Sequence, residues 1–185
     1  DNLSGMTNLE IAIDTFDSSG INDPKVLKVI GDFSTWLRDQ PEVDHVNTLS
    51  DTLMRLNKNM HGDDESYYSL PTDRELSAQY LLLYEMSLPY GLDLNNQLNV
   101  DKSATRLTVT MDNMTTTEMR ALEERAEEWL KTNAPAHMQP IATGASIMFA
   151  YISERNIKAM LLGTFIAFLL ISASLVIALK SPRLG

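Results

Sequence analysis

The sequence offers few side chains arranged for catalysis. Its three histidines, His45, His61 and His137, are scattered, and no serine, threonine or lysine near them forms a motif with a base and an orienting group. Gly144-Ala145-Ser146 matches half of a nucleophile elbow, but Met148 stands where the second glycine of that motif belongs. We therefore predict that the chain is not an enzyme and has no catalytic residue.

Two acidic stretches could bind a cation. The run from His61 to Glu65 carries imidazole and carboxylate groups, although a solvated acidic loop is the favoured interpretation. Oxygen-bearing side chains also alternate from Asp93 to Asp101, as in a calcium loop, but Leu98 and Ala104 replace the glycine and glutamate that such a loop needs. The chain has no cysteine, so thiolate ligands and disulfides are excluded. We predict no metal site and no cofactor.

The C-terminal part of the sequence predicts a membrane helix. Residues Met160 to Leu179 contain no charged side chain. Twenty residues at helical rise reach roughly 30 Å, about the thickness of a hydrocarbon core. A buried helix of a small soluble domain would be shorter and would keep a polar face. We therefore expect a transmembrane helix over 159–180.

Nearly all charged residues of the chain precede the predicted membrane helix. All 25 acidic residues and 13 of the 15 basic residues precede Met160, which gives this part a net charge of −12. Such a domain is a poor partner for nucleic acid. It would also be repelled by an anionic membrane surface, so we expect the helix to hold it at the membrane.

Small residues recur within the predicted membrane helix. Ala159, Gly163 and Ala167 are spaced four apart and would let another helix approach closely, although alanine and glycine are also simply common in membrane helices. Basic residues flank both ends of the span in equal number, so charge does not decide its orientation.

Two similar halves can be predicted before the membrane helix. Alternating apolar residues predict a strand over 8–14, and Asp23 can cap a helix whose first residue is Pro24. A short strand over 43–48 follows. The second half repeats this order with a strand over 106–111, a helix with a capping box formed by Thr115 and Glu118, and a strand over 138–143.

A helical and irregular segment, 49–101, separates the two halves. It predicts a helix over 50–60, a polar loop over 61–69 and a helix that starts near Thr72 and is apolar nearly all round at residues 79–86. The resulting order is strand, helix, strand, insertion, strand, helix, strand. We therefore predict an α+β fold, a ferredoxin-like split βαβ sandwich with a helical insertion. A further amphipathic helix over 146–158 is expected to run into the membrane helix.

Several strings along the chain resemble one family. They include Gly62-Asp63-Asp64, Gln79 to Glu85, Leu88 to Leu94, Ala142-Thr143-Gly144, Ser153 to Asn156 and Leu179 to Gly185. The chain is similar to bacterial exporters of the resistance-nodulation-division (RND) superfamily, in the branch with MMPL-type lipid transporters, hopanoid exporters and, more remotely, Patched-like proteins. The resemblance covers most of the chain and is densest after about Met60.

The resemblance implies a place for each part of the chain. Residues 1–158 would be an extracytoplasmic porter domain on the periplasmic side of the bacterial inner membrane, 159–180 the second transmembrane helix, and 181–185 the cytoplasmic start of a connecting loop. Both ends of the sequence then look like cuts from a longer polypeptide. Export would be driven by protons through residues of other helices, and the partners would be those helices, a second porter domain and a hydrophobic or lipid substrate.

The candidate wall of the substrate path lies in the inserted segment. It comprises Tyr80, Leu83, Tyr84, Met86 and Tyr90, and core packing of the same side chains is the competing interpretation. Two other functions remain open. One is a single-span, membrane-tethered extracytoplasmic sensor or ligand-binding domain. The other is a structural protein whose domain dimerises through the small-residue stripe of the membrane helix, so a homo-oligomer is a possible partner.

Overall fold

The computed structural model describes residues 7–89, 94–112, 114–135, 138–143 and 145–179. They divide into two compact units, 1–147 and 148–185. The chain is a mixed α+β protein with an antiparallel sheet and one long apolar helix near its C-terminal end. The unit boundary falls inside that helix, whereas the predicted membrane boundary lies further along it, at 158–159.

The first unit is built around a four-stranded sheet. The strands are β1 (Thr7–Asp14), β2 (Val43–Asn47), β3 (Ala104–Met111) and β4 (Gln139–Thr143), in the order β2-β3-β1-β4. β1 pairs antiparallel with both β3 and β4, and β2 pairs antiparallel with β3. The two halves of the chain therefore interleave, because each half contributes one central strand and one edge strand.

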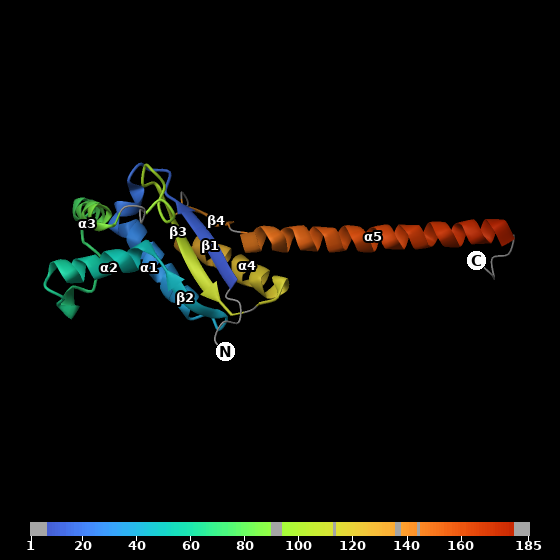
Figure 1. The fold of residues 1–185 in the computed structure, drawn as a ribbon, viewed down its shortest axis with the longest axis horizontal. Coiled ribbons are helices and arrows are strands. Elements are labelled where there is room, and N and C mark those ends of the chain that lie inside the picture. The colour runs from blue at the N-terminus through green and yellow to red at the C-terminus, as the bar shows by residue number, and fades with distance from the viewer. Residues whose placement is uncertain (1–6, 90–93, 113, 136–137, 144, 180–185) are drawn as a thin grey trace. The chain divides into compact units, whose positions relative to one another are not determined.

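Two helices cover one face of this sheet (Figure 1). They are α1 (Pro24–Arg38), which links β1 to β2, and α4 (Thr116–Asn133), which links β3 to β4. The predicted caps are confirmed, since Asp23 caps α1 and Thr115 forms a capping box with Glu118. Both helices start where a side-chain oxygen accepts a backbone N–H that would otherwise lack a partner.

The sheet and these helices share one hydrophobic core. On β1 and β3, alternate residues such as Leu9, Ile11, Leu107 and Val109 are buried against the helices. Three rings close the gap between α1 and α4, with centroids 5.1 Å apart for Phe33 and Trp129 and 6.1 Å for Trp36 and Trp129. The opposite face of the sheet has half-exposed, mostly polar side chains. The first face is therefore the core and the second is open.

The segment between β2 and β3 forms a second core beside the first. It contains α2 (Leu49–Met60), a short 3-10 helix η2 (Glu65–Tyr67) and α3 (Arg74–Ser87), and it packs against α1 and the 3-10 helix η1 (Gly20–Asn22) (Figure 1). The buried residues of this second core are Ile21, Leu27, Leu49, Leu53, Tyr80, Leu81, Leu94 and Leu98. The predicted helices of this segment are confirmed, and the predicted polar loop contains η2.

One helix crosses from the first unit into the second. Helix α5 (Ala145–Leu179) combines the predicted amphipathic segment and the predicted membrane helix without an interruption. Gly144, which precedes this helix, lies outside the described residues.

Candidate functional site

The histidines that the structure describes, His45 and His61, do not come together with a nucleophile into a catalytic group. His45 is exposed on edge strand β2, and His137 lies outside the described residues. His61 stacks on Tyr67 with ring centroids 3.8 Å apart, and its Nδ1 lies 2.8 Å from the carbonyl oxygen of Asn57. The described ranges contain no group of three histidine or acidic residues that could hold a metal ion.

The acidic side chains of the loop after α2 interact with groups of the loop itself and of the end of α2. Asp64 accepts a hydrogen bond from the backbone N–H of Ser66 at 2.9 Å, and this bond lowers the pKa of the Asp64 carboxyl. Glu65 pairs with Lys58, whose pKa is raised by the contact. Because the carboxylates are exposed and point to different partners, they form a solvated turn.

The substrate-path candidates on α3 fall on different sides of the helix. Tyr80 is buried in the second core, where its hydroxyl donates to Oδ1 of Asn57 at 3.2 Å. Tyr84 packs against the same core and is partly buried. Leu83 and Met86 are exposed, by 48% and 76%. Tyr90 lies outside the described residues. Among the candidates that the structure describes, Leu83 and Met86 are therefore the most accessible to a ligand.

Helix α3 keeps an apolar surface that the described chain does not cover. Leu82 is 53% exposed and joins Leu83 and Met86 in what we call the α3 patch. Because residues 79–86 are apolar nearly all round, cover on more than one side of this helix would be expected. The described chain covers only the side that carries Ser77, Tyr80 and Leu81.

Helix α5 contains the largest uncovered apolar surface. Residues Tyr151–Ile177 are long and apolar enough to cross a membrane, and none of the most apolar window is buried within the chain. Ala159, Gly163 and Ala167 are exposed along it, and a Cβ added at Gly163 would meet no atom within 4 Å. The described chain therefore supplies no neighbour for this stripe.

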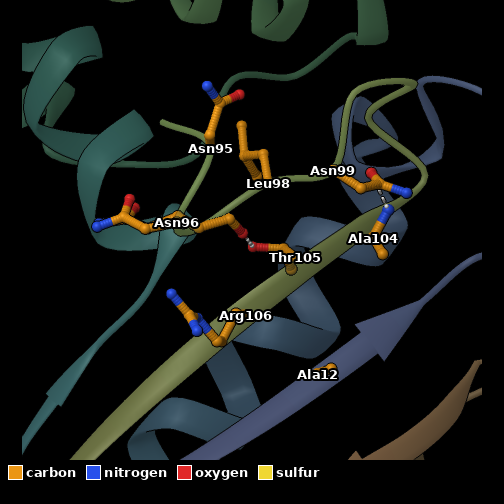
Figure 2. Close-up of a pocket in the computed structure, with 9 residues that line it drawn as sticks. Ala12, Asn95, Asn96, Leu98, Asn99, Ala104, Thr105 and Arg106 are labelled. Carbon is orange, nitrogen blue, oxygen red and sulfur yellow. Dashed lines mark hydrogen bonds between the residues drawn. The ribbon is translucent and has the colours of Figure 1, made fainter. Parts of the chain in front are cut away.

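A separate hollow of about 260 Å³ opens on the uncovered face of the sheet (Figure 2). Figure 2 shows Ala12 and Arg106 on adjacent strands, with Asn96 on the segment that precedes β3. The lining residues are Ala12, Asn95, Asn96, Gln97, Leu98, Asn99, Ala104, Thr105 and Arg106. We call this cavity the sheet pocket.

The sheet pocket exists because β2 is shorter than β3. β2 pairs with β3 only as far as Thr108, which leaves the first half of β3 without a partner strand on that side. The segment 97–99 takes this place: the backbone N–H of Arg106 donates to the carbonyl oxygen of Gln97 at 2.8 Å, and Leu98 bridges to Thr105. Leu98 and Thr105 are buried, and Gln97 and Arg106 are half exposed.

Residues 95–99 of this pocket belong to the segment whose residue types do not fit a calcium loop. The structure supports this exclusion for Asn99, whose Oδ1 accepts the N–H of Ala104 at 2.9 Å and whose Nδ2 donates to Ser103. The asparagine therefore shapes a turn. Ala12 and Arg106 were recognised only as strand residues, because nothing in their local sequence shows that β1 and β3 are neighbours.

Comparisons with known proteins give no family for the chain. No protein-family model matches the sequence. No curated protein matches it either. The fold and surfaces define the chain as an α+β domain followed by one helix with the length and composition of a membrane span.

Proposed function

We propose that this chain is part of a proton-driven membrane exporter of hydrophobic or lipid-like molecules. In this proposal it supplies a periplasmic domain of the substrate path and the transmembrane helix that follows. The observation that carries the proposal is the unburied apolar surface of α5 over Tyr151–Ile177. A surface of this length is stable in a hydrocarbon environment and unstable in water.

The topology of the first unit supports a porter domain. The strand order, with two strand-helix-strand units and helices on one face, supports the proposal of a ferredoxin-like sandwich. The helical insertion between the halves corresponds to residues 49–101. We propose that residues 1–158 lie in the periplasm and that α5 enters the inner membrane.

The α3 patch is our candidate for the wall of the path. Leu83 and Met86 are accessible to an apolar ligand, and methionine adapts to ligands of different shape. Tyr80 and Tyr84 would hold the helix in place from its buried side, since Tyr80 lies in the second core and Tyr84 packs against it. A second porter domain of the same exporter would close the path from the other side.

The topology can be tested by cysteine labelling, because the native chain has no cysteine. In whole cells, a membrane-impermeant maleimide should label Ser66→Cys and should label Ser181→Cys only after the cells are broken. Labelling of both positions from outside would contradict the orientation. Sequencing the reading frame beyond Gly185 gives a second test: about a dozen apolar spans in two similar halves are expected for an exporter.

The substrate path requires a transport assay with the full exporter. Replacing Leu83 and Met86 together by serine should reduce export of a fluorescent lipid analogue without lowering the melting temperature. Val100→Ser is the matched control, because Val100 is 95% exposed and lies outside the patch. Equal export by both variants would argue against the α3 patch.

A membrane-tethered ligand-binding domain is the second candidate function. It is favoured by the sheet pocket, whose described lining comes entirely from the first unit of this chain. If the reading frame contains a single apolar span, the exporter proposal fails and this function replaces it.

A further inference from the structure

The sheet pocket owes its shape to one small side chain. Ala12 lies directly opposite Arg106 in the pairing of β1 and β3, and both side chains are on the open face. Its neighbours on the same face of β1 are the longer Glu10 and Asp14. A hollow therefore forms above Ala12, bounded by Arg106 and by the segment 95–99.

Several hydrogen-bonding groups at the pocket remain available to a ligand. Arg106 uses Nη1 to pair with Oε2 of Glu10 at 3.1 Å, which leaves Nη2 and Nε without another hydrogen bond to the described residues. Within the same part of the chain, the side-chain amides of Asn96 and Gln97 also make no hydrogen bond. Each amide can donate and accept, whereas the guanidinium only donates.

The local charges disfavour an ionic ligand. The charge of Arg106 is offset by Glu10, and Asp14 lies opposite Ala104 at the margin of the pocket. The part of the chain before Met160 also carries a net charge of −12. An anion would be repelled by these carboxylates. A cation would meet the guanidinium N–H donors of Arg106, which it cannot use.

We propose that the sheet pocket binds a neutral, polyhydroxylated ligand, such as the ring of a sugar. Adjacent hydroxyl groups can accept from the planar N–H fork of Arg106 and can both donate to and accept from the amides of Asn96 and Gln97. Ala12 and Ala104 provide a small apolar floor for the C–H face of the ring. No aromatic ring is among the described lining residues, so we expect weak binding.

The cysteine-free chain allows a local measurement of binding. Val100→Cys, next to Asn99 of the pocket lining, would be labelled with an environment-sensitive fluorophore in the full chain reconstituted in lipid nanodiscs. Methyl α-glucoside is the neutral probe. Acetate and inorganic phosphate are the anionic probes, and ethanolamine is the cationic probe. Saturable binding of the glucoside alone is the expected result.

Two variants test whether the glucoside occupies the sheet pocket. Ala12→Leu fills the hollow and leaves every hydrogen-bonding group in place, so we expect the dissociation constant to rise by roughly tenfold or more. Thr110→Leu is the matched control, since Thr110 is on the open face of the same sheet but outside the pocket lining. If Ala12→Leu fails to fold, Gln97→Ala serves in its place, because the Gln97 side chain makes no hydrogen bond to the described residues.

The outcomes separate the proposal from its alternatives. Binding of an anion or of ethanolamine without the glucoside would overturn the neutral class, and absence of binding by every probe would overturn the site. Equal weakening by Ala12→Leu and Thr110→Leu would also overturn it. Octyl glucoside distinguishes the source: pocket-dependent binding tighter than that of methyl glucoside indicates a glycolipid headgroup, and equal binding indicates a free sugar. The test does not depend on whether the chain belongs to an exporter.

Discussion

Helices α3 and α5 are both rich in apolar residues, but they use them differently. Along α3, Tyr80 and Leu81 are buried and the neighbouring Leu82 and Leu83 are exposed. Along α5, the most apolar window has no buried residue. Helix α3 is therefore packed against the domain on one side only, and its other side keeps the small apolar α3 patch exposed. An isolated patch is compatible with an aqueous domain, whereas a continuous apolar cylinder requires an apolar solvent.

The largest expected effect follows from placing a charge in α5. Leu170→Arg puts a cation near the middle of the apolar run, which costs about 2.5–3.5 kcal/mol in membrane insertion. We expect a marked loss of the chain from the alkali-resistant membrane fraction. Leu82→Arg in α3 is the matched control, and it should leave the membrane fraction unchanged. Equal behaviour of the two variants would remove the distinction between the helices.

Two adjacent leucines of α3 give the next largest effect. Leu81 is fully buried and Leu82 is 53% exposed, so the same change to alanine samples both sides of one helix turn. We expect Leu81→Ala to destabilise the domain by about 2–5 kcal/mol and Leu82→Ala by less than about 1 kcal/mol. Urea unfolding of the full chain in micelles measures both. A similar loss for the two variants would show that the α3 patch is covered.

Acid should destabilise the first unit of the chain and leave the apolar helix of the second unit unaffected. Arg125 donates to Glu42 at 2.8 Å and lowers the pKa of that carboxyl below its ordinary value of 4.5. A lowered folded pKa contributes stability above the unfolded pKa, and this stability is lost as the pH falls through the folded value. We expect the domain to lose stability below about pH 4.5, while α5 remains in the membrane because Met160 to Leu179 has no charged group.

Glu42→Gln provides the control for this pH dependence. The variant should be less stable than the parent at neutral pH, and the difference should shrink as the pH falls. Thermal unfolding at several pH values measures the two curves. A constant difference between parent and variant across the acid range would exclude a contribution from Glu42 ionisation.

The smallest effect is expected at Gly163, and it should depend on the context of the chain. A larger side chain meets nothing within 4 Å in this chain, so Gly163→Leu should leave its stability unchanged. In the proposed exporter, a neighbouring helix packed on Ala159, Gly163 and Ala167 would be displaced. A lower melting temperature and reduced transport are therefore expected only there. Normal behaviour in the full protein would argue against a packed stripe.

Local patterns predicted most of the elements correctly. Alternation identified β1 and β3, and the caps at Asp23 and Thr115 gave the starts of α1 and α4, because strand period and capping are properties of nearby residues. The apolar run of α5 was equally clear. For α3, periodicity could not decide which apolar residues would be buried, since leucine occupies positions 81, 82 and 83 on different sides of the helix.

The sheet pocket could not have been predicted in the same way. Its residues come from β1, from the segment before β3 and from β3 itself, with Ala12 and Arg106 more than ninety positions apart in the numbering. The pocket depends on β1 pairing with β3 and on β2 ending early, and both are long-range facts. Arg106 shows no special feature in the sequence because its surroundings are supplied by other strands.

The sequence alone determined the order of strands and helices, the acidic character of the domain and the apolar run of α5. These depend on composition and on spacings of a few residues. Only the tertiary structure decided which side of α3 is buried, that Tyr80 is a core residue, and that Ala12, Gln97 and Arg106 line one pocket. Those outcomes depend on which surfaces lie opposite one another, and chain neighbours do not specify that arrangement.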